Sequence, residues 1–347
     1  MFPEQREDCT PAITLPRINF VIIALPCGNR PLSLRPMFSI INALIPVFLI
    51  ILLGAALKRV KLFDDGAWTG YENLCYFVLF PILLVKTLAG AQLGSTEVLR
   101  FSLVLLFAIC TMSALLLFSF PLMNRFLGVN RAAFTSLLQG ATRWHGFIAL
   151  SIVGLLYGDP GVTYMAITMA VIIPPLNIIN VAVLARFGAS RTNFPGVMRK
   201  VIRNPFILAC LVGSGLNLTG IGLPAPCYEV FNILGGGALG LGLLTVGAGL
   251  HLGKVKQQRG LVLFGAMIRL LGMPLLMFTG AWLFDIDGLP LVVAVLAGAV
   301  PTAASSYVLA RQMGGDAPLM ANLITVQVLF AVVTLPCMMW LAGSAGL

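Results

Sequence analysis

Residues 298–307 read Gly-Ala-Val-Pro-Thr-Ala-Ala-Ser-Ser-Tyr, which places a proline and a cluster of polar residues inside a long apolar run. Proline removes a backbone N–H donor and clashes with the preceding turn, so this stretch predicts an interrupted helix. Residues 139–146, Gln-Gly-Ala-Thr-Arg-Trp-His-Gly, interrupt a second apolar run. Backbone that is not helical is tolerated at membrane depth only where it is buried in protein or lines a wet cavity. The two stretches predict a membrane protein built around a pair of broken helices.

The composition supports a membrane environment for the whole chain. Of the 347 residues, 59% are hydrophobic and 10% are charged, whereas soluble domains carry about 25% charged residues. The net charge of +10 comes from basic residues in short stretches between apolar runs, which is a topology signal and not a nucleic-acid-binding patch. The seven cysteines show no metal-ligand or redox spacing, so we expect no metal and no cofactor.

Apolar runs of the length that a helix needs to cross lipid, about 20 residues, recur from Phe38 to the end of the chain. We expect ten spans, near residues 38–57, 67–90, 101–122, 131–157, 162–185, 205–223, 229–250, 261–284, 289–311 and 318–342.

The runs divide into two similar sets. Residues 1–36 hold prolines, charges and one short apolar stretch, and we interpret them as an N-terminal extension outside the bundle. Residues 37–190 contain the first five spans, 191–203 form a basic loop, and 204–347 contain the last five. An odd number of spans in each half makes the halves enter the membrane in opposite orientations, which predicts an inverted repeat.

The distribution of Lys and Arg predicts the orientation of the bundle. Loops after the odd-numbered spans hold clusters of basic residues, whereas the loops after the even-numbered spans contain a single basic residue, Arg100. Basic residues in short loops stay in the cytoplasm. We therefore expect a multi-pass protein of the inner (plasma) membrane with both ends of the bundle outside.

The interruptions fall in the fourth span of each half. Arg143 lies about 18 Å along the axis from the start of its span, and Pro301 is similarly deep, so both breaks reach the middle of the bilayer. If the two spans cross, two helix N-termini meet there and favour an anion. Two helix C-termini end there as well, so the dipoles alone leave the sign open.

Arg143 favours an anion because no acidic residue lies in the apolar core of any expected span. A buried Arg normally has a partner, and a visiting carboxylate would supply one. The alternative is that carbonyl oxygens freed at the break satisfy its guanidinium.

Further polar residues near the breaks are candidates for the same site. His145 is a candidate to contact the anion or gate a proton, or else to bond a freed carbonyl. Lys86 and Arg269 either snorkel to the interface or line the pathway. The expected substrate-binding set is Arg143, His145, Gln139, Thr142, Asn177, Asn180, Pro301, Thr302, Ser305 and Ser306.

Four stretches carry a resemblance to a known family. They are Gln139–Arg143, Pro174–Asn177, Arg203–Phe206 and, above all, Val300–Ala310 with its continuation to Gly315-Asp316 and Thr334–Pro336. Over residues 38–342 the chain resembles the auxin efflux carrier family, which contains the plant PIN carriers.

The resemblance implies ten helices in two inverted five-helix repeats, with helices four and nine crossing at mid-membrane. It also implies an elevator-type movement, a homodimer and, for bacterial members, malate or malonate as substrates. His145 departs from the Asn that is usual in the family, and the fourth span lacks the proline found at this break in plant carriers.

Together these observations predict a secondary transporter for a small organic anion such as a mono- or dicarboxylate. The lack of a carboxylate in the apolar core of any expected span favours uniport or exchange, and the alternative is Na⁺- or H⁺-coupled symport. A membrane enzyme is not expected, because no acidic pair and no His-Glu-x-x-His motif lies within a span. A receptor that binds without transporting is the remaining alternative.

Overall fold

The computed structural model describes residues 37–91, 94–188, 203–250 and 258–345. The described part is helical, without a strand. The predicted extension at 1–36 and nearly all of the basic loop at 191–203 lie outside the described residues, as does His251, the second of the chain's two histidines.

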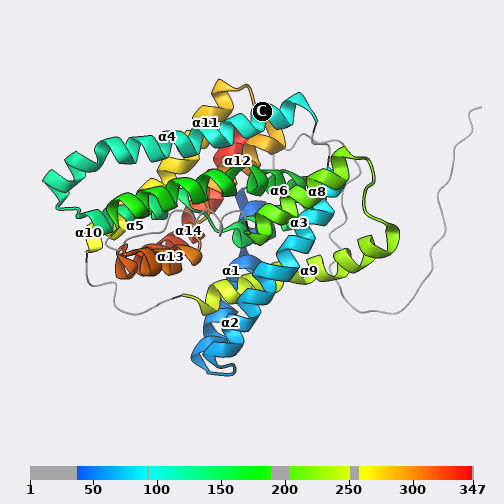
Figure 1. Cartoon of the computed structure of the whole chain (residues 1–347), viewed down its shortest axis with the longest axis horizontal. Coiled ribbons are helices and arrows are strands. Elements are labelled where there is room, and N and C mark those ends of the chain that lie inside the picture. Colours follow the sequence, from blue (N-terminus) through cyan, green and yellow to red (C-terminus); the bar gives the residue numbers. More distant parts are fainter. Residues whose placement is uncertain (1–36, 92–93, 189–202, 251–257, 346–347) are drawn as a thin grey trace, which may run out of the picture. The chain divides into compact units, whose positions relative to one another are not determined.

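The helices follow the apolar runs closely (Figure 1). In chain order they are α1 (Met37–Arg59), α2 (Asp65–Leu74), the π-helical turn η2 (Cys75–Leu79), α3 (Phe80–Ala89), α4 (Thr96–Leu127), α5 (Arg131–Thr142), α6 (Gly146–Phe187), α8 (Pro205–Leu218), α9 (Ala225–Ala248), α10 (Arg259–Met267), the π-helical turn η3 (Ile268–Gly272), α11 (Met273–Leu283), α12 (Gly288–Ala299), α13 (Ser305–Met313) and α14 (Ala317–Ala345).

Seven helical stretches of the described chain are long and apolar enough to cross a membrane. One of them runs from Arg131 to Phe187 through the break between α5 and α6. Within α6, Gly158 has φ 58° and ψ −147°, a conformation that glycine adopts readily and other residues rarely do. It marks a kink between the expected fourth and fifth spans. The remaining apolar helices, α8 and α12, are shorter. The described part of the chain is thus all helical, and its long helices have the length and composition of membrane-spanning helices.

Polar side chains cap the starts of α5 and α8. Asn130 accepts a hydrogen bond from the N–H of Ala133 at the start of α5. Asn204 accepts one from Phe206 at the start of α8, where Pro205 occupies the first helical position. These caps satisfy orphan N–H groups at the helix starts.

The helices pack in two groups. In the first, α1 packs on α9, and α3 packs on both α8 and α9 (Figure 1). Glycines allow the closest of these contacts, because a Cβ on Gly247 would overlap the carbonyl oxygen of Ile51. In the second group, α4 packs on α11, and α12 packs on α6, α11 and α14. The long helix α6 also contacts α1, α3, α8 and α9, and so joins the two groups.

Candidate functional site

Both predicted helix breaks are present, and they meet. Helix α5 ends at Thr142 and α6 begins at Gly146, while α12 ends at Ala299 and α13 begins at Ser305. The residue after each first half is extended, with φ −73° and ψ 152° at Arg143 and φ −69° and ψ 148° at Val300. The backbone N–H of His145 donates to the carbonyl oxygen of Pro301 across 2.9 Å.

Arg269 binds the carbonyl ends of both first halves. Its Nε donates to the carbonyl oxygen of Val300 at 2.8 Å, its Nη2 to Ala297 at 2.8 Å and its Nη1 to Ala141 at 3.2 Å. The last carbonyls of a helix have no partner within the helix, and this guanidinium satisfies three of them. The expectation that Arg269 snorkels or lines the pathway was wrong, because its side chain is 1% exposed and lies between the breaks.

Gln327 of α14 joins the two breaks a second time. Its Oε1 accepts from the N–H of Thr302 at 2.8 Å, and its Nε2 donates to the carbonyl oxygen of Gly140 at 3.0 Å. The hydroxyl of Thr302 donates to the same Gly140 oxygen at 2.5 Å. The sequence analysis missed Gln327, although an amide in the middle of an apolar helix is a signal for such a role.

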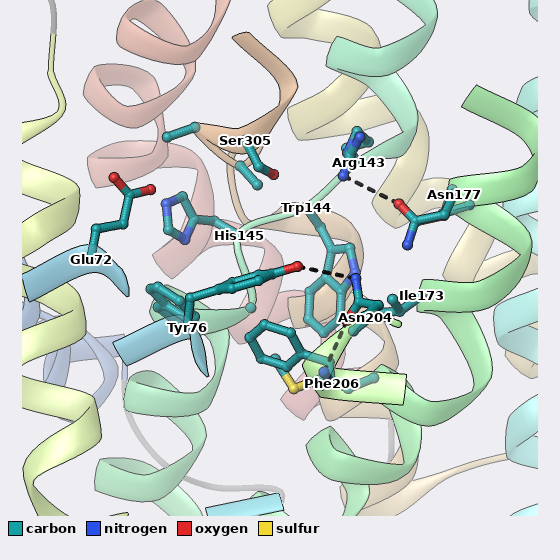
Figure 2. A pocket seen from close by; sticks show the side chains of 16 residues that line it. Glu72, Tyr76, Arg143, Trp144, His145, Ile173, Asn177, Asn204, Phe206 and Ser305 are labelled. Atoms are coloured by element: carbon teal, nitrogen blue, oxygen red, sulfur yellow. Dashed lines mark hydrogen bonds between the residues drawn. The ribbon is translucent and has the colours of Figure 1, made fainter. Parts of the chain in front are cut away.

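A cavity of about 190 Å³ lies beside the meeting point. Its walls come from α2 and η2, from the first break with the start of α6, from the middle of α6, from the start of α8 and from the second break (Figure 2). Polar or charged side chains on the walls are those of Glu72, Tyr76, Arg143, His145, Asn177, Asn204 and Ser305.

Arg143 is the cationic side chain among the residues that line this cavity. It is half-buried, and its Nη2 donates to Oδ1 of Asn177 at 3.3 Å (Figure 2). The described residues give its guanidinium no carboxylate within 4.0 Å. The freed carbonyls that were the alternative partner of Arg143 are instead occupied by Arg269.

Both second half-helices begin at this cavity. Gly146 and Phe147 at the start of α6 line it, as do Ala304 and Ser305 at the start of α13. Neither helix has a side-chain cap at its N-terminus. Uncapped N-termini present backbone N–H groups and partial positive charge, which together attract an anion.

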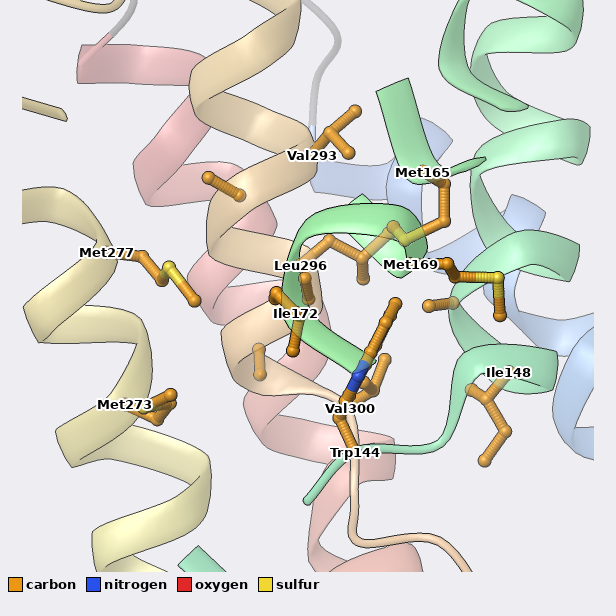
Figure 3. Packing of buried hydrophobic residues seen from close by; sticks show 14 of the residues in the cluster. Trp144, Ile148, Met165, Met169, Ile172, Met273, Met277, Val293, Leu296 and Val300 are labelled. Carbon is orange, nitrogen blue, oxygen red and sulfur yellow. The ribbon is translucent and has the colours of Figure 1, made fainter. Parts of the chain in front are cut away.

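The rest of the cavity wall is apolar. Phe147 stacks on Phe80 with ring centroids 3.9 Å apart, and Phe206 closes the side formed by α8. Trp144 lies between the cavity and the core, where it packs among Met165, Met169 and Ile172 (Figure 3). An apolar wall around a few polar groups is typical of small-molecule sites, and polar contacts beside such a wall are stronger than in bulk water.

His145 lines the cavity with a ring that forms no hydrogen bond to a described residue. Its Nδ1 is buried without a partner, and the ring meets Phe147 edge-on with centroids 5.6 Å apart. The expected alternative, a ring nitrogen bonded to a freed carbonyl, is not formed.

Several residues of the predicted set do not line the cavity. Asn180 is fully buried and donates to the carbonyl of Leu176, while its Oδ1 accepts from the Thr142 hydroxyl at 3.3 Å. The expectation that Asn177 and Asn180 share the cavity was therefore wrong. The cavity walls also omit Gln139, Thr142, Pro301, Thr302 and Ser306, which are all buried at or near the breaks.

Lys86 lies away from this cavity. Its Nζ donates to Oδ1 of Asn232 at 2.6 Å and sits 4.9 Å from the centroid of the Tyr228 ring, both on α9. The interaction ties the end of α3 to the start of α9.

Glu72 is a wall residue that the sequence analysis missed. The expectation that no carboxylate belongs to the site was wrong, because Glu72 lines the same cavity as Arg143 and His145 (Figure 2). Glu72 lies near the start of its apolar run, so its position along that run did not indicate that it belongs to a site in the middle of the membrane. Its carboxylate forms no hydrogen bond or ion pair with a described residue.

A model of the family described as "Membrane transport protein" matches residues 39–339. The chain belongs to this family. It is the auxin efflux carrier family, with PIN-like members, so the resemblance drawn from the breaks is confirmed.

Known relatives of the family agree with this assignment. The chain is 22% identical over 316 residues to the uncharacterized transporter YfdV of Escherichia coli strain K12, an alignment that covers 88% of this chain and 97% of the relative. The same values hold for YfdV of Escherichia coli O157:H7 and of Shigella flexneri. The family and these relatives are transporters and not enzymes, which supports a transport function for this chain.

Proposed function

We propose that the protein is a secondary transporter for a small organic anion, a mono- or dicarboxylate, that binds in the cavity beside the two breaks. One observation carries the proposal: the same cavity is lined by Arg143 and by the uncapped N-termini of α6 and α13. A carboxylate there receives charge-assisted hydrogen bonds from the guanidinium and from backbone N–H groups.

Ten spans in two inverted repeats are the proposed arrangement in the membrane. Counting α5 with the first part of α6 as the fourth span and α12 with α13 as the ninth yields ten crossings. The packing supports a repeat, because the α1–α9 and α3–α8 contacts correspond when the halves are exchanged, and the α4–α11 contact corresponds to itself. Both ends of the bundle then lie on the outer side of the inner membrane, opposite the basic loops on the cytoplasmic side.

Elevator-type alternating access is the proposed movement. The cavity lies between two groups of elements. Tyr76 of η2 and Phe206 of α8 line it from the group of α1, α2, η2, α3, α8 and α9, and Arg143 and Ser305 line it from the group that holds both breaks. A sliding of the second group along the first would carry an anion bound at the breaks across the membrane. A homodimer would anchor the first group.

A second candidate is proton-coupled symport of the same anion. Glu72 favours it, because proton coupling usually uses a carboxylate within the membrane, and this carboxylate lines the anion cavity. Sodium coupling has no comparable support among the described residues, which contain no cluster of acidic or histidine ligands.

Ligand-induced thermal stabilisation of the purified protein tests the proposed site. Malonate and propionate serve as probes, for wild type, Arg143→Ala and Lys86→Ala. A ligand that binds the folded state stabilises it in proportion to the logarithm of its concentration above Kd. We expect stabilisation of wild type and Lys86→Ala, and none of Arg143→Ala. Equal stabilisation of all three by either probe would reject the site.

A further inference from the structure

Arg269 is a buried cation that the proposed binding step does not use. It is fully buried, and it lies on η3, the π-helical turn between α10 and α11. Its three hydrogen bonds reach the C-terminal ends of both α5 and α12. The described residues place no carboxylate within 4.0 Å of its guanidinium. Its positive charge is therefore balanced by backbone carbonyls and by no acidic side chain.

The charges at the breaks can be compared in sign and size. A helix end is equivalent to about half an elementary charge, negative at the C-terminus and positive at the N-terminus. The C-termini of α5 and α12 together contribute about one negative charge, and the N-termini of α6 and α13 together contribute about one positive charge. Without a further ion the four ends cancel and favour neither sign. The single positive charge of Arg269 offsets the two C-termini.

We propose that Arg269 determines the ion selectivity of the site, by neutralising the negative helix ends so that Arg143 and the two N-termini dominate the field at the cavity. Arg269 is then a positioning and specificity-determining residue that does not touch the ligand. The inference rests on the proposed anion site and adds the reason for its sign. The hydrogen bonds to Ala297 and Val300 show that the guanidinium contacts the negative end of α12 directly.

A purely structural role is the competing explanation, in which Arg269 only supplies hydrogen bonds that hold the breaks together. The two explanations differ for Arg269→Lys and Arg269→Met. Lysine keeps the charge but cannot reproduce the planar set of donors, whereas methionine removes both. If the charge sets the selectivity, anion affinity follows the charge, and thermal stability follows the hydrogen bonds.

The experiment measures the midpoint of thermal unfolding and the Kd for malonate of purified wild type, Arg269→Lys and Arg269→Met. Lys86→Met is the matched control, because it removes the same unit charge from a basic residue that does not line the cavity. We expect both Arg269 variants to unfold at lower temperature. Arg269→Lys should bind malonate within about threefold of wild type. Arg269→Met should bind it on the order of tenfold more weakly, because a buried unit charge beside the breaks is lost.

Two outcomes overturn the inference while the anion site stands. One is a folded Arg269→Met that binds malonate as tightly as Lys86→Met and wild type. The other is a folded Arg269→Lys that has lost affinity by tenfold or more, since geometry and not charge would then control binding. If Arg269→Met does not fold, Arg269→Lys decides alone. Absence of malonate and propionate binding in wild type contradicts the proposed function instead.

Discussion

The backbone N–H of His145 donates to the carbonyl oxygen of Pro301 across 2.9 Å, and this bond joins the two helix breaks directly. The two residues are far apart in the sequence, and each lies in the non-helical segment of its own interrupted helix. Around this bond, Arg269 and Gln327 bind carbonyl oxygens at the C-terminal ends of α5 and α12. The N-terminal ends of α6 and α13 line the cavity. The meeting point is therefore asymmetric in charge.

Asn177 offers a way to occupy Arg143 from within the protein. Its Oδ1 already accepts from the Arg143 guanidinium at 3.3 Å. We expect Asn177→Asp to form an ion pair with Arg143 and to compete with an external carboxylate, weakening malonate binding by a factor of about ten or more. Asn177→Leu is the control, because it removes the hydrogen bond without supplying a charge. Equal affinities of the two variants, measured by calorimetry, would show that Arg143 does not hold the anion.

Gly247 should be intolerant of any side chain. A Cβ at this position would overlap the carbonyl oxygen of Ile51, whereas a Cβ at Gly237 on the same helix meets nothing within 4 Å. We expect Gly247→Ala to separate α1 from α9 and lower the yield and unfolding temperature of the purified protein. Gly237→Ala should be neutral or stabilising by up to about 1 kcal/mol, the helix preference of Ala over Gly. Similar thermal unfolding of both variants would contradict the packing described for α1 and α9.

Gln327 should stabilise the breaks without contacting the ligand. Gln327→Leu removes the acceptor for the Thr302 N–H and a donor to the Gly140 carbonyl. A buried group left without a partner costs about 1–3 kcal/mol, so we expect a clear fall in unfolding temperature. The control is Thr334→Val, because the Thr334 hydroxyl is buried without a hydrogen-bond partner among the described residues. A Gln327→Leu protein as stable as this control would remove Gln327 from the account.

Because Glu72 lines the cavity, we expect the protein to take up a proton when the anion binds. Charges of the same sign in one cavity repel each other, so a bound carboxylate and ionised Glu72 oppose each other, and by reciprocity the anion favours protonation of Glu72. Tyr76, Arg143 and His145 are the other titratable groups on the cavity wall. Calorimetry in buffers of different ionisation enthalpy counts the protons that enter on binding.

We expect proton uptake in wild type at pH values where the free Glu72 carboxyl is ionised, and its loss in Glu72→Gln. At these pH values Glu72→Gln should also bind malonate more tightly than wild type, because the opposing charge is gone. His145→Gln is the matched variant, since its ring lines the same cavity. Proton uptake that persists in Glu72→Gln but vanishes in His145→Gln would move this role to the histidine.

The sequence was sufficient to locate the breaks, because proline, glycine and polar residues in an apolar run act on the local backbone. Arg143 followed from the same stretch, as a cation next to an interruption. The role of Arg269 did not follow, since position along one helix does not reveal which carbonyls of other helices lie beside it. Asn180 shows the same limit: it is one turn from Asn177, yet it packs toward Thr142 and not toward the cavity.

Counterflow of labelled malonate into proteoliposomes loaded with unlabelled malonate tests the central claim most directly, because it requires both a site and its movement. Wild-type protein should accumulate label transiently above empty liposomes, and Arg143→Ala, reconstituted to the same level and still folded, should not. Counterflow by Arg143→Ala equal to wild type would contradict an anion site built on this arginine. Binding without counterflow in wild type would indicate a receptor instead of a carrier.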